Sequence, residues 1–389
     1  KNTHITLPIP HIHSSSPLPS NMSASPVSVS AAAVAPAESE TIEQQMNSYP
    51  IVDLANYLDK SGDFDSQCKK ISQLLHDFGL LIVRDPRVDD SLNTNFLNML
   101  EQYYDQPTEV RMVDARPEVH YQVGVTPEET ERARNHCARM KGLNEADRPL
   151  TECPPEKDHK SRFFWRIGAP PPTDAHRDLN MPPVVPKNFP QWTETMNGWG
   201  ETILRTVKTV SEMAAIGFGL PSDTFTSKMN YAPHLLAPTG SNLREHGKLG
   251  TVFAGYHYDL NFLTIHGKSR FSGLYVWTRE GKKMLVKVPD GCLLLQAGKQ
   301  FEWLTGGYVL AGFHEVVVNE QAIAAKEAAE AAGRSLWRIS STLFSHIASA
   351  ESLEPVAHFK NEPTAANYPK ITAGEQVLDE LKAISLAQA

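Results

Sequence analysis

The sequence has few cysteines, no long apolar run and no excess of positive charge. Its four cysteines form no CxxC pair and no zinc-ribbon spacing, and nothing in them demands disulfides, so we expect a reducing compartment, the cytoplasm. No apolar run approaches the length that spans a bilayer, so no membrane partner is expected. A net charge of −8 argues against binding to the phosphate backbone of nucleic acids. These absences favour a small-molecule partner and leave the oligomeric state open.

The composition changes near the start of the chain. Residues 1–46 are rich in Ser, Pro and Ala and almost lack aromatic side chains. Such a segment buries too little apolar surface to offset the entropy lost on ordering, so we predict a flexible leader. It lacks the continuous apolar core of a secretory signal, and the first arginine is Arg84, which argues against a typical transit peptide.

Helical patterns dominate residues 47–222, which we assign to an N-terminal region. Apolar residues repeat every three or four positions from Ile71 to Phe78 and predict an amphipathic helix. A second helix is expected around 96–104, and a long one from Trp192 to Gly217. The segment 120–190 is irregular and proline-rich, and long irregular segments in compact enzymes tend to be lids or binding loops.

Short strands separated by turns dominate residues 223–389, which we assign to a catalytic core ending in a C-terminal helix. This spacing predicts a mainly β fold with helical elaboration, in which two sheets form a double-stranded β-helix, or jelly roll. We expect this core to form one structural unit with 47–222. An Ala-rich segment from Asn319 to Arg334 interrupts the strands and predicts an inserted helix that Gly333 ends.

Three side chains in this core have the pattern of a metal site. His257 and Asp259 lie two positions apart on a predicted strand, so they point to the same face. His314, from a distant strand, completes a set of two histidines and one carboxylate, which leaves coordination positions open and suits non-haem Fe(II) oxygen chemistry. Each residue alone has an ordinary structural explanation. Their joint occurrence in this order predicts metal ligands and catalytic residues.

A carboxylate-binding pair follows the three ligands in the sequence. Arg338 offers a planar fork of donors that holds a carboxylate through two hydrogen bonds, and Ser340 lies on the same face of the strand. A structural ion pair on a half-exposed strand is the alternative. Together with the three ligands, the pair makes up the minimal parts of an oxygenase that uses a 2-oxoacid.

The order H-x-D, then H, then R-x-S resembles the isopenicillin N synthase-like family of 2-oxoglutarate/Fe(II)-dependent dioxygenases. Longer runs agree with the family as well, and the resemblance extends from about Ser48 to about Leu381. These runs are His257–His266 (H-T-D-x-x-x-L-T in the family), Gly273–Val276 (G-L-Q-V), Val288–Gly298, Asn230–Pro233 (N-x-Y-P), Tyr49–Leu54 (I-P-x-I-D-L) and Tyr368–Glu375. The inserted helix before Arg338 departs from the plant members, in which R-x-S follows the distal histidine much more closely.

The resemblance implies a dioxygenase that oxidises a small organic molecule. The two histidines and the aspartate would hold Fe(II), and 2-oxoglutarate and O2 would be the cosubstrates, with 2-oxoglutarate converted to succinate and CO2. Arg338 and Ser340 would bind the far carboxylate of 2-oxoglutarate, assisted by Tyr231, which matches the tyrosine of the family's N-x-Y-P segment. Hydroxylation, desaturation, demethylation and cyclisation all stay open as outcomes.

Other functions fit some of the same residues. An Fe(II) oxidase of the same fold, such as isopenicillin N synthase or 1-aminocyclopropane-1-carboxylate oxidase, also has the R-x-S pair, so Arg338 does not decide the cosubstrate. A non-enzymatic small-molecule-binding protein would bind its ligand without consuming oxygen, and the complete ligand set argues against it. A nucleic-acid demethylase is disfavoured by the acidic balance and by the lack of a basic stripe.

Candidate substrate residues come from two places. Arg162 and Arg166 flank an aromatic run, Phe-Phe-Trp, that combines cationic and aromatic side chains in the irregular segment. The alternative is an aromatic strand that packs on the core with its arginines in solvent. Phe253 shares the inward face with His257 if the strand alternates, so we expect it to border the substrate.

Overall fold

The computed structural model describes residues 49–172, 176–384 and 386, and the predicted leader 1–46 lies outside them. The helices are α2 (Ala55–Leu58), α3 (Phe64–Phe78), α4 (Asp90–Tyr104), α5 (Thr108–Arg111), α6 (Cys137–Lys141), α7 (Trp192–Gly217), α8 (Leu243–His246), α9 (Lys299–Leu304), α10 (Glu320–Ala331) and α11 (Ala373–Ala383). The strands are β1 (Ile51–Asp53), β2 (Leu80–Arg84), β3 (Gly124–Thr126), β4 (Ser161–Ile167), β5 (His234–Leu236), β6 (Thr239–Asn242), β7 (Val252–Tyr258), β8 (Leu263–His266), β9 (Leu274–Trp277), β10 (Lys283–Leu285), β11 (Leu293–Ala297), β12 (Phe313–Val317), β13 (Trp337–Ser340) and β14 (Thr342–Ser345).

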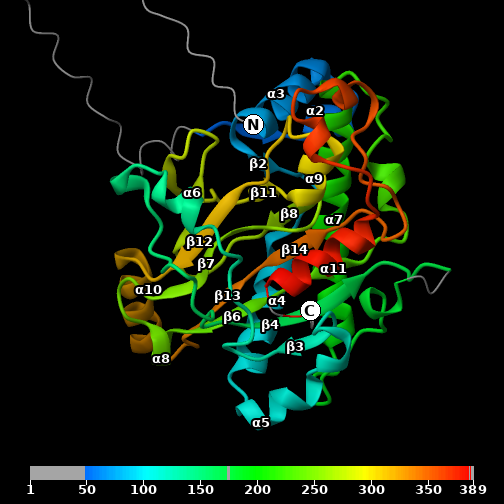
Figure 1. The fold of residues 1–389 in the computed structure, drawn as a ribbon. Coiled ribbons are helices and arrows are strands. Elements are labelled where there is room, and N and C mark those ends of the chain that lie inside the picture. Colours follow the sequence, from blue (N-terminus) through cyan, green and yellow to red (C-terminus); the bar gives the residue numbers. More distant parts are fainter. Residues whose placement is uncertain (1–48, 173–175, 385, 387–389) are drawn as a thin grey trace, which may run out of the picture. The chain divides into compact units, whose positions relative to one another are not determined.

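The strands form two sheets (Figure 1). The larger sheet has the order β1-β2-β11-β8-β14-β5-β4-β6-β13, with β3 paired to β4, and the smaller has the order β10-β9-β12-β7. Apart from the parallel pair β1 and β2, the pairings are antiparallel. From β7 to β13 the chain passes back and forth between the sheets, as in a double-stranded β-helix. The predicted fold class is confirmed.

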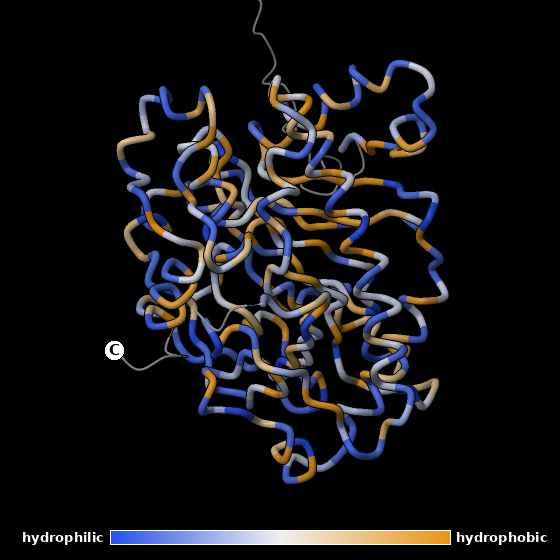
Figure 2. The backbone as a smooth tube through the Cα atoms, turned by 90° about the vertical axis from the view of Figure 1, so that its right-hand side faces the viewer, coloured by the Kyte–Doolittle hydropathy of each residue, from blue (hydrophilic) through white to orange (hydrophobic). Residues whose placement is uncertain are grey.

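The long helix α7 supports the larger sheet. It packs against α3 and α4 on one side and contacts β4, β8 and β14 on the other. Its buried apolar residues, among them Trp199, Ile203 and Val207, repeat at three- and four-residue spacing, which places them on the face toward the sheet. In Figure 2, hydrophobic positions concentrate along the inner strands, and the outer loops are largely hydrophilic.

Local sequence explains where the helices begin and end. The Asp63 side chain accepts a hydrogen bond from the Ser66 amide at 3.1 Å and so caps the start of α3. Gly79 ends this helix with φ 62°, and a Cβ at this position would lie 2.9 Å from the Leu310 carbonyl oxygen. Asn319 caps α10 in the same way, through the Ala322 amide at 2.8 Å. The predicted inserted helix is therefore present.

The cysteines differ from the expectation. Cys137 and Cys153 are joined in a disulfide, whereas Cys68 and Cys292 are free and buried. The bonded pair is separated by 16 residues and has no motif spacing, so only the folded segment brings the two sulfur atoms together. In the part of the chain that the structure describes, no helix combines the length and the apolar character needed to cross a membrane.

Candidate active site

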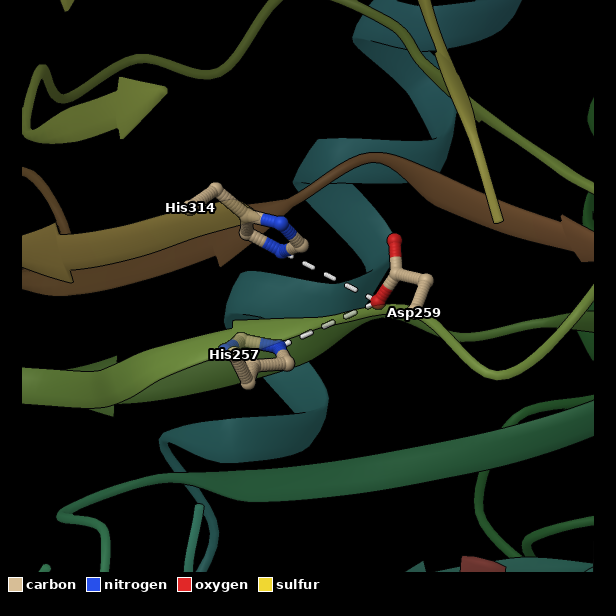
Figure 3. Close-up of side chains that lie close together, drawn as sticks. All are labelled: His257, Asp259 and His314. Carbon is tan, nitrogen blue, oxygen red and sulfur yellow. Dashed lines mark ion pairs between the residues drawn. The ribbon is translucent and has the colours of Figure 1, made fainter. Parts of the chain in front are cut away.

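The two histidines and the aspartate of the predicted metal site lie close together in the β core (Figure 3). His257 on β7 and His314 on β12 are directly paired in the register of these antiparallel strands, and their ring centroids are 4.2 Å apart. Asp259 follows β7, and its Oδ1 lies 3.8 Å from Nε2 of each histidine. The donor atoms lie within 4.8 Å of one another, a spacing that one metal ion fits.

Hydrogen bonds determine which atoms of these three side chains are left free to bind a metal. Nδ1 of His257 lies 2.5 Å from the Gly255 carbonyl, and Nδ1 of His314 lies 3.4 Å from the Gly312 carbonyl. A carbonyl only accepts, so Nδ1 carries the proton and Nε2 keeps a free lone pair. Asp259 accepts the Thr264 hydroxyl on Oδ2 at 2.6 Å, which leaves Oδ1 for a metal. The residues present therefore fit a divalent ion.

The surroundings favour the protonation states that metal binding needs. Burial lowers the pKa of His257 well below its ordinary value, and the nearby His314 and Lys160 act in the same direction. Burial alone would raise the pKa of Asp259, but His314, His257 and the hydrogen bond from Thr264 hold it below its ordinary value. For His257 and Asp259 these shifts favour the neutral imidazole and the ionised carboxylate, which are the forms that bind a divalent metal.

One cavity extends from these three side chains to Arg338 on β13. Its wall includes Thr239, Ser241, Phe253, His266, Ser340 and Thr342. Arg338 is only 7% exposed, its Nε donates to the Ser272 carbonyl at 3.1 Å, and no described carboxylate pairs with it. Burial lowers the pKa of Arg338 to about 10, so the group is still a cation at neutral pH. A buried guanidinium in this situation fits the carboxylate of a small ligand.

A second cavity meets His257 and Asp259 from another side. Its apolar wall comes from β4, β5, β14 and the C-terminal segment: Phe164, Leu235, Phe344, Leu381, Ile384 and Leu386. Lys160 and Arg162 line both cavities, close to His257. The buried Glu131 carboxylate pairs with both cations, and Lys160 also contacts Asp158 at 2.7 Å.

Of the four remaining predicted residues, two line a cavity and two do not. Phe253 lines the cavity of Arg338, and Arg162 lines both cavities. Arg166 lines neither, because its guanidinium is buried and donates to Asn180 Oδ1 at 2.7 Å and to nearby backbone carbonyls. Tyr231 is 56% exposed and also lines neither cavity. The aromatic run is the strand β4, with both arginines largely buried rather than in solvent.

Several residues of the site were not expected from the sequence. Thr264 belongs to a quoted motif, but its bond to Asp259 becomes evident only in the fold. Glu131 and Lys160 are 29 positions apart and fit no motif, and the apolar residues after α11 are far from the metal ligands in sequence. Glu380 of α11 accepts hydrogen bonds from Tyr258 at 3.0 Å and Arg134 at 3.0 Å, which ties this helix to the strand of His257.

The fold and this site define a class, the non-haem iron oxygenases built on a double-stranded β-helix. Residues 227–347 match the sequence model of the 2OG-Fe(II) oxygenase superfamily, a range that contains the three candidate ligands, Arg338 and Ser340. The match covers the part of the chain that carries this site, and it supports a dioxygenase that uses Fe(II), 2-oxoglutarate and O2 on a small molecule. The recognition of the family from its motifs is thereby confirmed.

Individual relatives are distant. A 1-aminocyclopropane-1-carboxylate oxidase of Dictyostelium mucoroides is 19% identical over 321 residues, which are 72% of this chain and 80% of the relative. A Caulobacter crescentus protein assigned to the 2OG-Fe(II) oxygenase family has a TM-score of 0.68 at 20% identity, covering 86% of this chain and 98% of the other. A full-length Neurospora crassa protein, solved in complex with alpha-KG, has a TM-score of 0.67 at 15% identity, with coverages of 86% and 95%. At these identities the solved structures establish the fold alone.

Proposed function

We propose that His257, Asp259 and His314 hold Fe(II), and that Arg338 and Ser340 bind the far carboxylate of 2-oxoglutarate. The observation that carries this proposal is the buried guanidinium, unpaired with any described carboxylate, in the cavity that begins at the three ligands. Ser340 lies on the same strand and accepts a hydrogen bond from the Thr239 amide at 3.2 Å, so its hydroxyl hydrogen is free to be donated. Tyr231 takes no part, since its side chain is exposed outside both cavities.

The other cavity is the place we assign to the substrate. Bound Fe(II) supplies the activation of O2, which is coupled to the conversion of 2-oxoglutarate to succinate and CO2. The chain contributes position and shielding: the apolar side chains Phe164, Phe344 and Leu381 exclude water beside the ligands. Lys160 and Arg162 provide hydrogen-bond donors where the two cavities meet. These features suit a small organic molecule with an apolar body, and the oxidative outcome depends on which of its bonds faces the metal.

The remaining expectations become proposals about organisation and location. We infer that residues 47–222 shape the substrate cavity and that 223–389 are the catalytic core, because both supply residues to the two cavity walls.

We keep the cytoplasm as the location on the basis of the free, buried Cys68 and Cys292. The Cys137–Cys153 disulfide argues in the opposite direction, and secretion of a tagged chain would refute this location. The acidic net charge supports the expectation of no nucleic-acid partner.

An anaerobic titration tests the assignment directly. Adding Fe(II) and then 2-oxoglutarate to the metal-free protein should produce a weak visible charge-transfer band that requires both additions. The band should be lost in Asp259→Ala and His314→Ala. Iron binding without a band would favour the oxidase that does not use 2-oxoglutarate. Unchanged iron content and activity in Asp259→Ala would show that the ligand assignment is wrong. Succinate release then provides the readout for a substrate screen.

A further inference from the structure

A second group of metal-binding side chains lies outside both cavities. Glu128 follows β3, and Glu245 and His246 belong to the short helix α8, which Figure 1 shows beside α10. His246 Nε2 lies 3.6 Å from Glu128 Oε2 and 3.9 Å from Glu245 Oε2. The three donor atoms lie within 4.8 Å of one another. Apart from the proposed iron ligands, this is the one such group in the described ranges.

The distances fit a shared ion better than direct hydrogen bonds. An N–H to oxygen hydrogen bond has its heavy atoms about 2.7–3.2 Å apart, so both nitrogen-to-oxygen distances are too long. Nitrogen and oxygen ligands about 2.1 Å from a tetrahedral Zn²⁺ ion lie roughly 3.4 Å from one another. The two nitrogen-to-oxygen pairs therefore need to close by only a few tenths of an ångström. A cation between the two carboxylates would also reduce the repulsion between their negative charges.

A second imidazole borders the group. The His159 ring stacks on the His246 ring with centroids 4.3 Å apart and an angle of 11° between the planes. Its Nδ1 is buried without a hydrogen-bond partner and lies 3.8 Å from Glu129 Oε1. Buried polar atoms ordinarily have partners, so an unpartnered ring nitrogen beside a glutamate at the edge of this group calls for one.

We propose that Glu128, Glu245 and His246 form a second divalent-metal site, at the surface and separate from the iron centre. A mixed set of imidazole and carboxylate donors favours a borderline-soft ion of the Zn²⁺ class over Mg²⁺ or Ca²⁺, which take oxygen ligands. The site joins the segment after β3 to α8, two parts of the chain that are more than a hundred residues apart.

This site lies behind the charged wall of the substrate cavity. The Glu129 amide donates to the Asp158 carbonyl at 3.1 Å, and the Asp158 amide donates to the Glu131 carbonyl at 2.9 Å. The same two segments carry Glu131, Asp158 and Lys160, whose side chains line the cavity, while His159 lies at the outer group. An ion at the outer group therefore restrains the backbone that holds the inner ion pairs.

Zn²⁺ titration of the full chain tests the proposal. The background carries Asp259→Ala and His314→Ala, so that the iron site does not compete. We expect one equivalent of Zn²⁺ whose affinity falls at least tenfold in His246→Ala, and likewise in Glu128→Gln. His358→Ala, which removes an exposed histidine elsewhere, is the matched control and should leave this equivalent unchanged. The leader sequence contains His4, His11 and His13, so only the equivalent that depends on His246 counts.

Further measurements test whether His246 coordinates the ion, whether each variant folds, and which class of ion binds. Co²⁺ in place of Zn²⁺ should give a visible spectrum of nitrogen and oxygen coordination that is lost with His246. A circular dichroism spectrum equal to that of the background shows that each variant folds, and Glu245→Gln replaces any variant that does not. Zn²⁺ binding that is equal with and without His246 would overturn the proposal. Equal competition by Mg²⁺ would overturn the assigned ion class.

Discussion

Replacing Arg338 by methionine should separate ligand binding from stability. The guanidinium is buried, has one hydrogen bond to the Ser272 carbonyl, and faces no described carboxylate. In the absence of 2-oxoglutarate, the folded protein therefore contains a buried cation whose lost hydration is compensated only by this hydrogen bond. We expect Arg338→Met to lose most of the affinity for 2-oxoglutarate while the ligand-free protein keeps nearly all of its free energy of unfolding.

The expected magnitudes follow from burial and pairing. Burial lowers the pKa of Arg338 from 12.5 to about 10, which corresponds to about 3 kcal/mol against the charged form in the folded state. Because the folded pKa is the lower one, this penalty is present at every pH below about 10. Methionine removes the penalty but leaves the Ser272 carbonyl unpaired, at roughly 1–3 kcal/mol, so the two effects nearly offset. Loss of a buried charge pair with the ligand costs about 2–5 kcal/mol, a rise in Kd of roughly 30-fold or more.

Arg166 offers a matched control for this experiment. It is another buried arginine whose pKa is lowered to about 10 by burial, but its donors are used by Asn180 and by backbone carbonyls. Arg166→Met should lose more stability than Arg338→Met, because four acceptors lose their partner instead of one while a similar burial penalty is removed, and it should keep the response to 2-oxoglutarate.

Thermal unfolding without oxygen, in the presence of Fe(II), provides the assay. At 100 times the wild-type Kd, 2-oxoglutarate should stabilise the wild-type protein by about 2.7 kcal/mol and the Arg338→Met variant by less than about 1 kcal/mol. The reasoning is refuted if Arg338→Met keeps the full ligand response. It is also refuted if the ligand-free variant loses as much stability as Arg166→Met, because Arg338 would then be a structural residue.

Three further predictions concern other parts of the protein. Thr264→Val should weaken Fe(II) binding by about 10-fold or more by releasing Oδ2 of Asp259, while Thr264→Ser keeps the affinity; equal affinities in an anaerobic titration would contradict this role. Burial lowers the pKa of His346 to about 3, so the unfolded chain takes up the proton first and stability falls as the pH drops below about 6.5. Urea unfolding at pH 7 and pH 5 should show about 2 kcal/mol less loss in His346→Gln, and identical losses would refute the burial argument. Reduction of the Cys137–Cys153 disulfide should lower the free energy of unfolding by about 2–4 kcal/mol, measured with and without dithiothreitol against Cys153→Ser, which should not respond.

Short-range patterns account for the parts of the fold that were predicted. The helix α7 was expected from Trp192 to Gly217 and has these bounds, because its apolar positions repeat with the helical period over many turns. The helix α10 was expected from alanine content and from Gly333, and its asparagine cap is local as well. Alternation along the strand predicted His257 and Asp259 on one side of the chain, and their side chains do approach each other in the structure.

Predictions that depended on long-range packing were less successful. Tyr231 matches a family segment in sequence, but the chain turns at this residue with φ 61° and leaves the side chain exposed. Arg162 and Arg166 look equivalent on β4, and only their neighbours in the fold distinguish them: Arg162 reaches Glu131, and Arg166 reaches Asn180. Neither partner has a sequence spacing that would indicate the contact.

The sequence by itself determined the class of chemistry, because the ligand types, their order and the alternation along the strand can be recognised without knowledge of the fold. It also determined the β-rich core and its principal helices through hydrophobic period and capping. Tertiary structure alone decided that Arg338 meets no carboxylate of the described chain, that Lys160 shares Glu131 with Arg162, and that the segment after α11 lines the substrate cavity. The physical reason is that charge compensation and cavity shape depend on distances between residues far apart in sequence, and these distances exist only after the sheets and helices have packed.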